Sequence, residues 1–266
     1  MSNHEQVLNK VLNKIAAEQK INDAQINIKS VSSGGANFTS QLFQATIGNG
    51  YKELKLFAKV GAIGEKLRAQ VETQLLIFDV ENFFYTKLYN IYESLQEKYN
   101  VPQDKRFVAP KCYGCSDKMY EEVIVLEDLL AQGFTVYDRM KSVYWNYAAR
   151  VVEQIARFHA LSVAFEKEHK EEFNKIVDRY NIQLVPVDLL QDSIKNAIKV
   201  VKEEYKDRLK RFLESSITVD YNEMYKPLKL NVLAHGDNRI SNHLHRKDAV
   251  STRSLYAVKK IALNVS

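Results

Sequence analysis

Two polar side chains that lie five positions apart, Asp237 and Asn242, are the strongest chemical signal in this sequence. They occur in the run His235-Gly236-Asp237-Asn238-Arg239-Ile240-Ser241-Asn242, directly after Asn231-Val232-Leu233-Ala234. Phosphoryl transfer to a hydroxyl group needs a carboxylate that orients the hydroxyl and accepts its proton, and a side-chain oxygen that holds a metal ion. An aspartate and an asparagine on a loop after an apolar strand supply both groups. For this run alone, a polar turn between two strands is the alternative.

A glycine-rich turn in the first part of the chain would suit a phosphate group. Residues 34–40 lie between two expected strands. Small residues at such a turn let backbone N–H groups approach phosphate oxygens without a Cβ atom in the way. The candidate phosphate-binding residues are therefore Gly34, Gly35, Asn37 and Ser40, and a plain hairpin turn is the alternative.

A lysine and a glutamate further along the chain are candidates for a buried ion pair. Lys59 lies near the end of the apolar strand 56–60, which would bury the stem of its side chain. A buried ammonium group needs an anion, and Glu81 on the long helix that follows is a suitable partner. Glu72 and Asp79 compete with Glu81 for this position, and a surface lysine at a strand end is the simpler alternative.

The apolar strand 123–126 ends in two acids, Glu127 and Asp128. In a kinase-like fold this segment would connect two lobes, and backbone groups near Glu127 and Leu129 would meet an adenine ring. A buried strand with a polar end is compatible with the same residues. The glycine-rich turn, the strand lysine, the helix glutamate and the aspartate–asparagine loop follow one another in the order found in kinases.

Hydrophobic periodicity predicts an α+β fold in which a strand-rich lobe precedes a helical lobe. We expect helices over 4–19, 65–99 with a possible break, 144–168, 171–180 and 188–216, and strands over 26–31, 41–47, 53–60, 110–114 and 119–126. The expected divisions are an N-terminal helix (1–25), an N-lobe (26–129), a partial C-lobe with the catalytic loop (130–245) and a basic tail (246–266).

Composition excludes several classes of protein. The 266 residues, 45% of them hydrophobic, suffice for one large domain or two lobes. Charges interrupt every apolar run and the N-terminus lacks an apolar signal core, so we expect neither a membrane span nor secretion. The net charge of +5 comes mostly from residues 243–266, with five basic residues and one acid. The nearly neutral remainder does not favour nucleic-acid binding.

The two cysteines, Cys112 and Cys115, have CxxC spacing. Zinc sites need about four ligands, and the sequence offers no other cysteine, so a strand with its turn is the favoured interpretation. Two cysteines without a secretion signal are typical of the reducing cytoplasm.

Several motifs together resemble the ecdysteroid kinase-like proteins, a branch of the choline kinase and aminoglycoside phosphotransferase superfamily (the CHK kinase-like domain). The resemblance covers roughly residues 25–245 and is most specific at Phe57-Ala58-Lys59-Val60, Phe78-Asp79-Val80-Glu81, Leu126-Glu127-Asp128-Leu129, Phe158-His159-Ala160-Leu161-Ser162 and Val232-Leu233-Ala234-His235-Gly236-Asp237. It implies a two-lobe, protein kinase-like fold that uses ATP and Mg²⁺ to phosphorylate an alcohol group on a small lipophilic molecule such as an ecdysteroid. By this resemblance Lys59 would hold the ATP phosphates, Glu81 would position Lys59, Asp237 would be the catalytic base and Asn242 a metal ligand.

The C-terminus departs from that family, which continues into a strand ending in an Asp-Phe-Gln-type triplet whose aspartate holds magnesium. Here Asn264 lies near that place, and a neutral amide is a poor substitute for a carboxylate. Residues 246–266 show no convincing match, so we expect a truncated chain with an incomplete helical C-lobe that transfers phosphate poorly or not at all. A non-catalytic nucleotide- or steroid-binding pseudokinase is the alternative function, and an interaction domain with a basic tail is a third.

Overall fold

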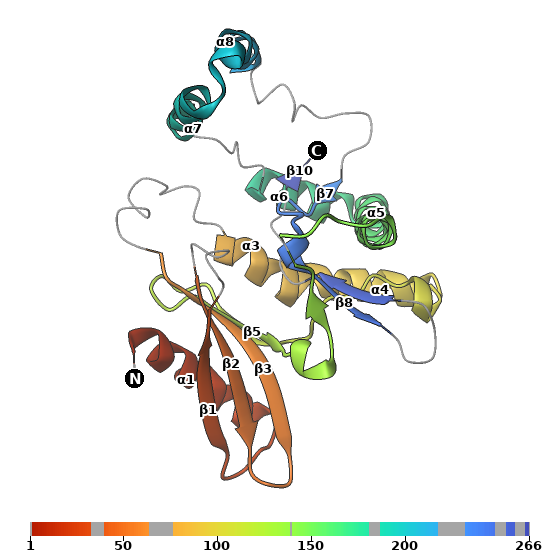
Figure 1. Ribbon diagram of the computed structural model, residues 1–266. Helices are drawn as coiled ribbons and strands as arrows, with labels where there is room; N and C mark the ends of the chain where they lie inside the picture. Colours follow the sequence, from red (N-terminus) through yellow and green to blue (C-terminus); the bar gives the residue numbers. More distant parts are fainter. Residues whose placement is uncertain are drawn as a thin grey trace.

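The computed structural model of the chain describes residues 2–32, 40–63, 77–138, 140–180, 187–217, 232–247, 254–258 and 264–265. The first part is a five-stranded sheet with the order β1-β2-β3-β5-β4, in which every neighbouring pair is antiparallel (Figure 1). Its strands are β1 (Gln25–Val31), β2 (Ser40–Gly48), β3 (Glu53–Gly61), β4 (Cys112–Ser116) and β5 (Val123–Glu127). The predicted antiparallel sheet is confirmed.

Helix α1 (Asn3–Glu18) covers one face of this sheet. Ser2 and Glu5 form a capping box at its start, which satisfies backbone donors that have no partner within the helix. Its buried residues Leu8, Leu12 and Ile15 recur at helical spacing and share a core with β2, β3 and β5. The alternation along β3 therefore places Leu56, Ala58 and Val60 toward α1 and directs Lys59 to the opposite face.

The opposite face of the sheet is covered by a long helix that contains an irregular turn. It consists of α3 (Ile77–Phe83), the π-helical turn η1 (Phe84–Leu88) and α4 (Tyr89–Lys98). A π-helical turn rotates the residues after it relative to those before it. Glu81 consequently faces the sheet, whereas Tyr92 on α4 packs against Phe158 with 5.4 Å between ring centroids.

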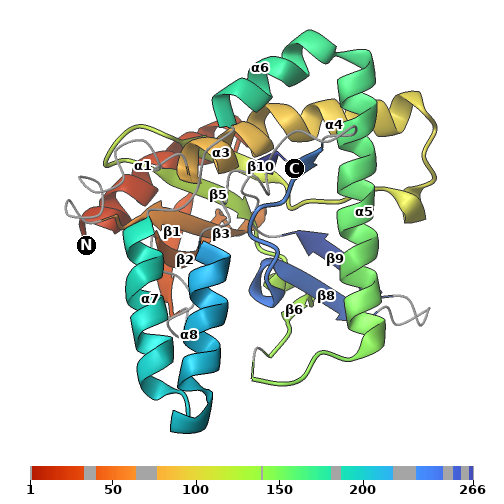
Figure 2. The same ribbon diagram turned by 90° about the horizontal axis from the view of Figure 1, so that it is seen from above.

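Helices α5 (Trp145–Glu168) and α6 (Lys170–Tyr180) lie on the far side of the long helix from the sheet (Figures 1 and 2). One core joins the sheet to these helices, because Ile124 and Leu126 of β5 belong to the same buried cluster as Phe84, Phe158 and Phe165. The strand-rich and helical parts therefore share a hydrophobic interior around α3–α4.

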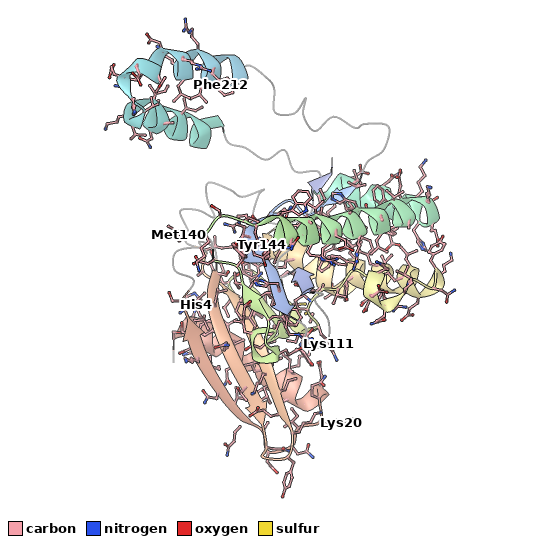
Figure 3. The ribbon with its side chains drawn as sticks, turned by 45° about the vertical axis from the view of Figure 1, so that its right-hand side comes forward. His4, Lys20, Lys111, Met140, Tyr144 and Phe212 are labelled. Atoms are coloured by element: carbon pink, nitrogen blue, oxygen red, sulfur yellow. The ribbon has the colours of Figure 1, made fainter. Side chains whose placement is uncertain are left out.

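The prediction of a single helix over 188–216 is wrong. The chain forms a hairpin of α7 (Val187–Val200) and α8 (Glu203–Ile217). Two adjacent β-branched residues, Val200 and Val201, disfavour continuation of a helix, and Glu203 and Glu204 in the first turn of α8 favour a new start there. The hairpin stands beyond α5 and α6, away from the sheet, and Figure 3 shows Phe212 on it.

Short strands follow in the last part of the chain. β6 (Thr135–Val136), β8 (His243–Lys247) and β9 (Ser254–Val258) form one sheet, and β7 (Leu233–Ala234) pairs with β10 (Asn264–Val265). The 3₁₀ turns are η2 (Gln103–Lys105), η3 (Leu130–Gln132) and η4 (Ile240–Asn242). Across the described ranges, no helix has the length and apolar character needed to span a membrane.

Candidate functional site

The predicted ion pair between Lys59 and Glu81 is present. Lys59 Nζ donates a hydrogen bond to Glu81 Oε1, and the two side chains are only 7% and 2% exposed. The pair forms because Lys59 points to the α3 face of β3 and Glu81 points from α3 toward the sheet. Buried ion pairs contribute little net stability compared with apolar residues of similar size. The retention of two buried charges here therefore suggests a functional role.

The groups near Glu81 keep it in a poorly solvated environment. Tyr85 lies one helical turn after Glu81 and is 5% exposed. Burial raises the pKa of the Tyr85 hydroxyl well above its usual value, and the negative charge of Glu81 raises it further. Tyr85 therefore remains neutral beside the ion pair.

Asp79 and Glu72 were the alternative partners of Lys59. Asp79 accepts hydrogen bonds from Arg179 Nη2 at 2.8 and 3.0 Å, so it has a different partner. Glu72 lies outside the described residues. Glu81 is accordingly the acid that meets Lys59.

Asp237 and Asn242 are brought together by the short turn η4. The Asn242 side-chain nitrogen donates to the Asp237 carbonyl oxygen at 2.7 Å and to Asp237 Oδ2 at 3.0 Å. The backbone N–H of Asn242 also donates to the carbonyl of Arg239 at 2.9 Å. Because the amide nitrogen is held by the Asp237 carbonyl, the amide oxygen is the atom suited to a hard metal ion.

The loop before Asp237 has a backbone conformation that favours glycine. Gly236 has a φ of +71°, which a side chain would strain. The Asp237 N–H donates to the carbonyl of His235 at 2.9 Å across this glycine. Two residues before His235, the N–H of Leu233 in β7 donates to Ser162 Oγ on α5 at 2.7 Å. Helix α5 thus holds the strand that leads into the loop.

Arg239 is a residue of this site that the sequence reasoning missed. Its Nε lies 2.7 Å from Asp237 Oδ1, and its Nη2 donates to Asp237 Oδ2 at 3.2 Å. Two parallel contacts of this kind fix the orientation of a carboxylate. The available signal was a basic residue two positions after the aspartate.

An apolar hollow lies where β5 leads toward η3. Its lining comes from β3, the residue Pro110 before β4, the end of β5 with the connector that follows it, and β8. The residues are Phe57, Pro110, Leu126, Glu127, Asp128, Leu129, Leu130 and Leu244. Glu127 and Leu129 therefore lie at a hollow, as their predicted position in a connector implies. The Glu127 carboxylate accepts from the Lys111 N–H at 2.8 Å and from Gln132 at 2.7 Å. These bonds hold the connector and leave the hollow lined mainly by apolar side chains.

The glycine-rich turn is only partly placed. Gly34, Gly35 and Asn37 lie outside the described residues. Ser40 begins β2 opposite Gly61 of β3. The role of these residues in phosphate binding stays a prediction.

The cysteines form part of strand β4, as favoured from sequence. Cys112 and Cys115 are free thiols. A hydrogen bond between the two thiols raises the pKa of Cys112, with burial adding to the shift, and lowers the pKa of Cys115. Cys115 Sγ also donates to Asn82 Oδ1 on α3 at 2.7 Å.

The amide oxygen of Asn242 fits magnesium, which prefers oxygen ligands and keeps several from water or phosphate. Both carboxylate oxygens of Asp237 already accept from Arg239, and Oδ2 also accepts from Asn242. The part of the chain that the structure describes contains no group of three or more His, Cys, Asp or Glu side chains placed to hold a metal ion. A magnesium ion here would therefore depend on phosphate oxygens for much of its coordination.

Comparison with known proteins identifies the family. The sequence model that describes the ecdysteroid kinase-like family matches residues 34–258 of this chain. The match extends past residue 245, so the expectation that the resemblance ends there is wrong. The matched range includes β9, which pairs with β8 although it lies in the segment expected to be an atypical tail. No curated protein matches the chain. The chain belongs to the ecdysteroid kinase-like family.

Proposed function

We propose, from its membership of the ecdysteroid kinase-like family, that this chain is an ATP-dependent phosphotransferase that uses Mg²⁺ and acts on an alcohol group of a small lipophilic molecule, such as an ecdysteroid. The observation that carries the proposal is the buried contact between Lys59 and Glu81. Lys59 lies on the same face of β3 as Phe57, and Phe57 lines the apolar hollow. Residues two apart on a strand are separated by about 7 Å. One nucleotide could therefore place its base in the hollow and its phosphates near Lys59.

The residues divide the work of phosphoryl transfer. Lys59 would bind phosphate oxygens, and Glu81 would hold its ammonium group in position. Asp237 would orient the acceptor hydroxyl and accept its proton, while Arg239 keeps the carboxylate oriented. Asn242 would bind magnesium through its amide oxygen, and the metal would neutralise charge on the phosphates.

A second candidate, a nucleotide-binding protein without turnover, is favoured by one observation. β9 ends at Val258, which pairs with His243, the residue after Asn242. The family resemblance would place a magnesium-binding aspartate after such a strand, but the next residue in the sequence is Lys259. Asn264, the expected substitute, pairs instead with Ala234 in β10 and β7.

Calorimetry with MgATP tests the nucleotide site. We expect the wild type to bind and Lys59→Met to bind about tenfold or more weakly, because a hydrogen bond to a charged group contributes about 1.5–3 kcal/mol. Lys98→Met is a matched control, since Lys98 is 60% exposed and pairs with Glu168. The proposed site is contradicted if the folded wild type does not bind MgATP, or if Lys59→Met binds it as tightly as the wild type does.

Phosphate transfer to a panel of sterols, ecdysteroids and simpler alcohols then separates the two candidates. Product detected by mass spectrometry, and lost in Asp237→Asn while MgATP binding persists, supports the phosphotransferase. Binding of MgATP without product from any alcohol in the panel supports the non-catalytic alternative. A cytoplasmic location, without nucleic-acid or membrane partners, is part of the proposal.

A further inference from the structure

Arg179, on helix α6, contacts the helix that carries Glu81. Its Nη2 donates to Asp79 Oδ1 at 2.8 Å and to Oδ2 at 3.0 Å. The Asp79 side chain is 17% exposed and that of Arg179 is 58% exposed. One hundred residues separate the partners in the sequence, and Figures 1 and 2 show α6 beside α3. The contact therefore ties the helical part of the chain to the helix over the sheet.

A second contact lies one helical turn further along α3. The ring of Phe83 packs on the ring of Tyr180 with centroids 5.2 Å apart. The Arg179 guanidinium lies 5.2 Å from the same Tyr180 ring. Asp79 and Phe83 are four residues apart, so they occupy one face of α3. The end of α6 thus holds that face at two points.

Glu81 projects from the other side of α3. It is two residues from both Asp79 and Phe83, and two residues correspond to about 200° around a helix with 3.6 residues per turn. The two contacts with α6 therefore oppose the contact between Glu81 and Lys59 across a helix of seven residues. A rotation of α3 that released one side would displace the other.

We propose that Arg179 is a positioning residue that holds α3 in the rotation in which Glu81 meets Lys59, and that it does so for the nucleotide site proposed above. Helix α6 follows α5 after a single residue, His169, and α5 holds the strand before Asp237 through Ser162. The same helical unit thereby supports both the Lys59–Glu81 pair and the loop of Asp237. Loss of the Arg179 contact weakens nucleotide binding without removing any group that touches the nucleotide.

The test combines two measurements on the full chain: MgATP affinity by calorimetry and hydrogen exchange of the amides in residues 78–88 by mass spectrometry. The variants are Arg179→Gln, Arg179→Lys, and the reversed pair Asp79→Arg with Arg179→Asp. Arg150→Gln is the matched control, because Arg150 also makes a 2.8 Å contact with an acid, Glu153, but on α5. Thermal unfolding reports whether each variant folds.

Exposed ion pairs have small energies, so we expect Arg179→Gln to weaken MgATP binding about threefold to fivefold and to speed exchange in residues 78–88 by a similar factor. The thermal midpoint should match that of Arg150→Gln. Arg179→Lys and the reversed pair should recover part of the loss, because both restore an ion pair.

Unchanged exchange in residues 78–88 of Arg179→Gln overturns the inference, as does faster exchange with unchanged MgATP affinity. If wild type does not bind MgATP, the proposed function fails. The exchange result then decides separately whether Arg179 restrains α3. Faster exchange that the reversed pair corrects supports that restraint even in this case.

Discussion

Replacing both members of the buried pair Lys59–Glu81 with apolar side chains should weaken nucleotide binding but leave the free energy of unfolding nearly unchanged. The substitutions are Lys59→Met, Glu81→Met and the double variant. Methionine has a flexible, unbranched chain that can occupy the space of either residue. Each single substitution leaves the partner charge buried in the interior, whereas the double variant removes both charges.

The expected magnitudes follow from the burial of the two residues, which are 6% and 2% exposed. Removing one partner of a buried pair costs about 3–5 kcal/mol, because the other charge stays desolvated without compensation. Replacing both partners with apolar residues of similar size is often neutral or stabilising. We therefore expect each single variant to be about 3–5 kcal/mol less stable than wild type and the double variant to lie within about 1 kcal/mol of it.

Urea unfolding followed by circular dichroism measures these free energies. A control cycle uses Lys98→Met and Glu168→Met, since that pair has exposures of 60% and 17%, and we expect its coupling to be about 0–1 kcal/mol. MgATP should bind to neither Lys59→Met nor the double variant with wild-type affinity. Additive losses in the double variant would refute the reasoning, because they would show that the two charges do not compensate each other.

Three further predictions concern the core and two titrating side chains. Phe158→Ala should lower the free energy of unfolding by about 3–5 kcal/mol, because Phe158 is 1% exposed. The control Val152→Ala lies on the same helix, where Val152 is 66% exposed, and should change that free energy by less than about 0.5 kcal/mol. Equal losses for the two variants in urea unfolding would contradict this. Burial lowers the pKa of His159 below 6.5. As the pH falls through 6.5, His159 therefore takes up a proton more readily in the unfolded chain than in the folded chain, which lowers the free energy of unfolding. His159→Gln should therefore lose less unfolding free energy than wild type between about pH 7.5 and 5.5, and parallel pH curves would exclude this contribution. The hydrogen bond from Cys112 lowers the pKa of Cys115 from 9.0, so iodoacetamide should alkylate Cys115 first at about pH 7.5. Cys112→Ala, which removes the donor, should slow that reaction, and mass spectrometry that found Cys112 modified first in the wild type would oppose it.

The features predicted from the sequence are those that depend on neighbouring residues. Alternation along 53–60 indicated a strand, and Lys59 in its apolar part indicated a buried partner, which the contact with Glu81 confirms. The spacing of Asp237 and Asn242 placed the two side chains on one loop, where they form hydrogen bonds. The resemblance to the ecdysteroid kinase-like family rested on short local motifs of the same kind.

Helix ends and short strands were harder to predict. The break at Val201 separates α7 from α8 although no glycine or proline marks it. β6 has only two residues and is a strand because β8 supplies its hydrogen bonds. In such elements the local preference is weak, so the partner decides whether the strand exists.

The amino-acid pattern by itself determined the strands of the sheet, the long helix after β3 and the loop of Asp237, because helical and strand periodicity act over short distances along the chain. It also indicated that Lys59 needs a buried anion, but the structure decided that Glu81 and not Asp79 supplies it. Only the tertiary structure decided which side chains meet across those elements. The apolar hollow joins Phe57, Leu129 and Leu244 from three separate segments, and Arg179 meets Asp79 across 100 residues. Such contacts join segments that are far apart in the sequence, and no local pattern encodes which of these segments will pack together.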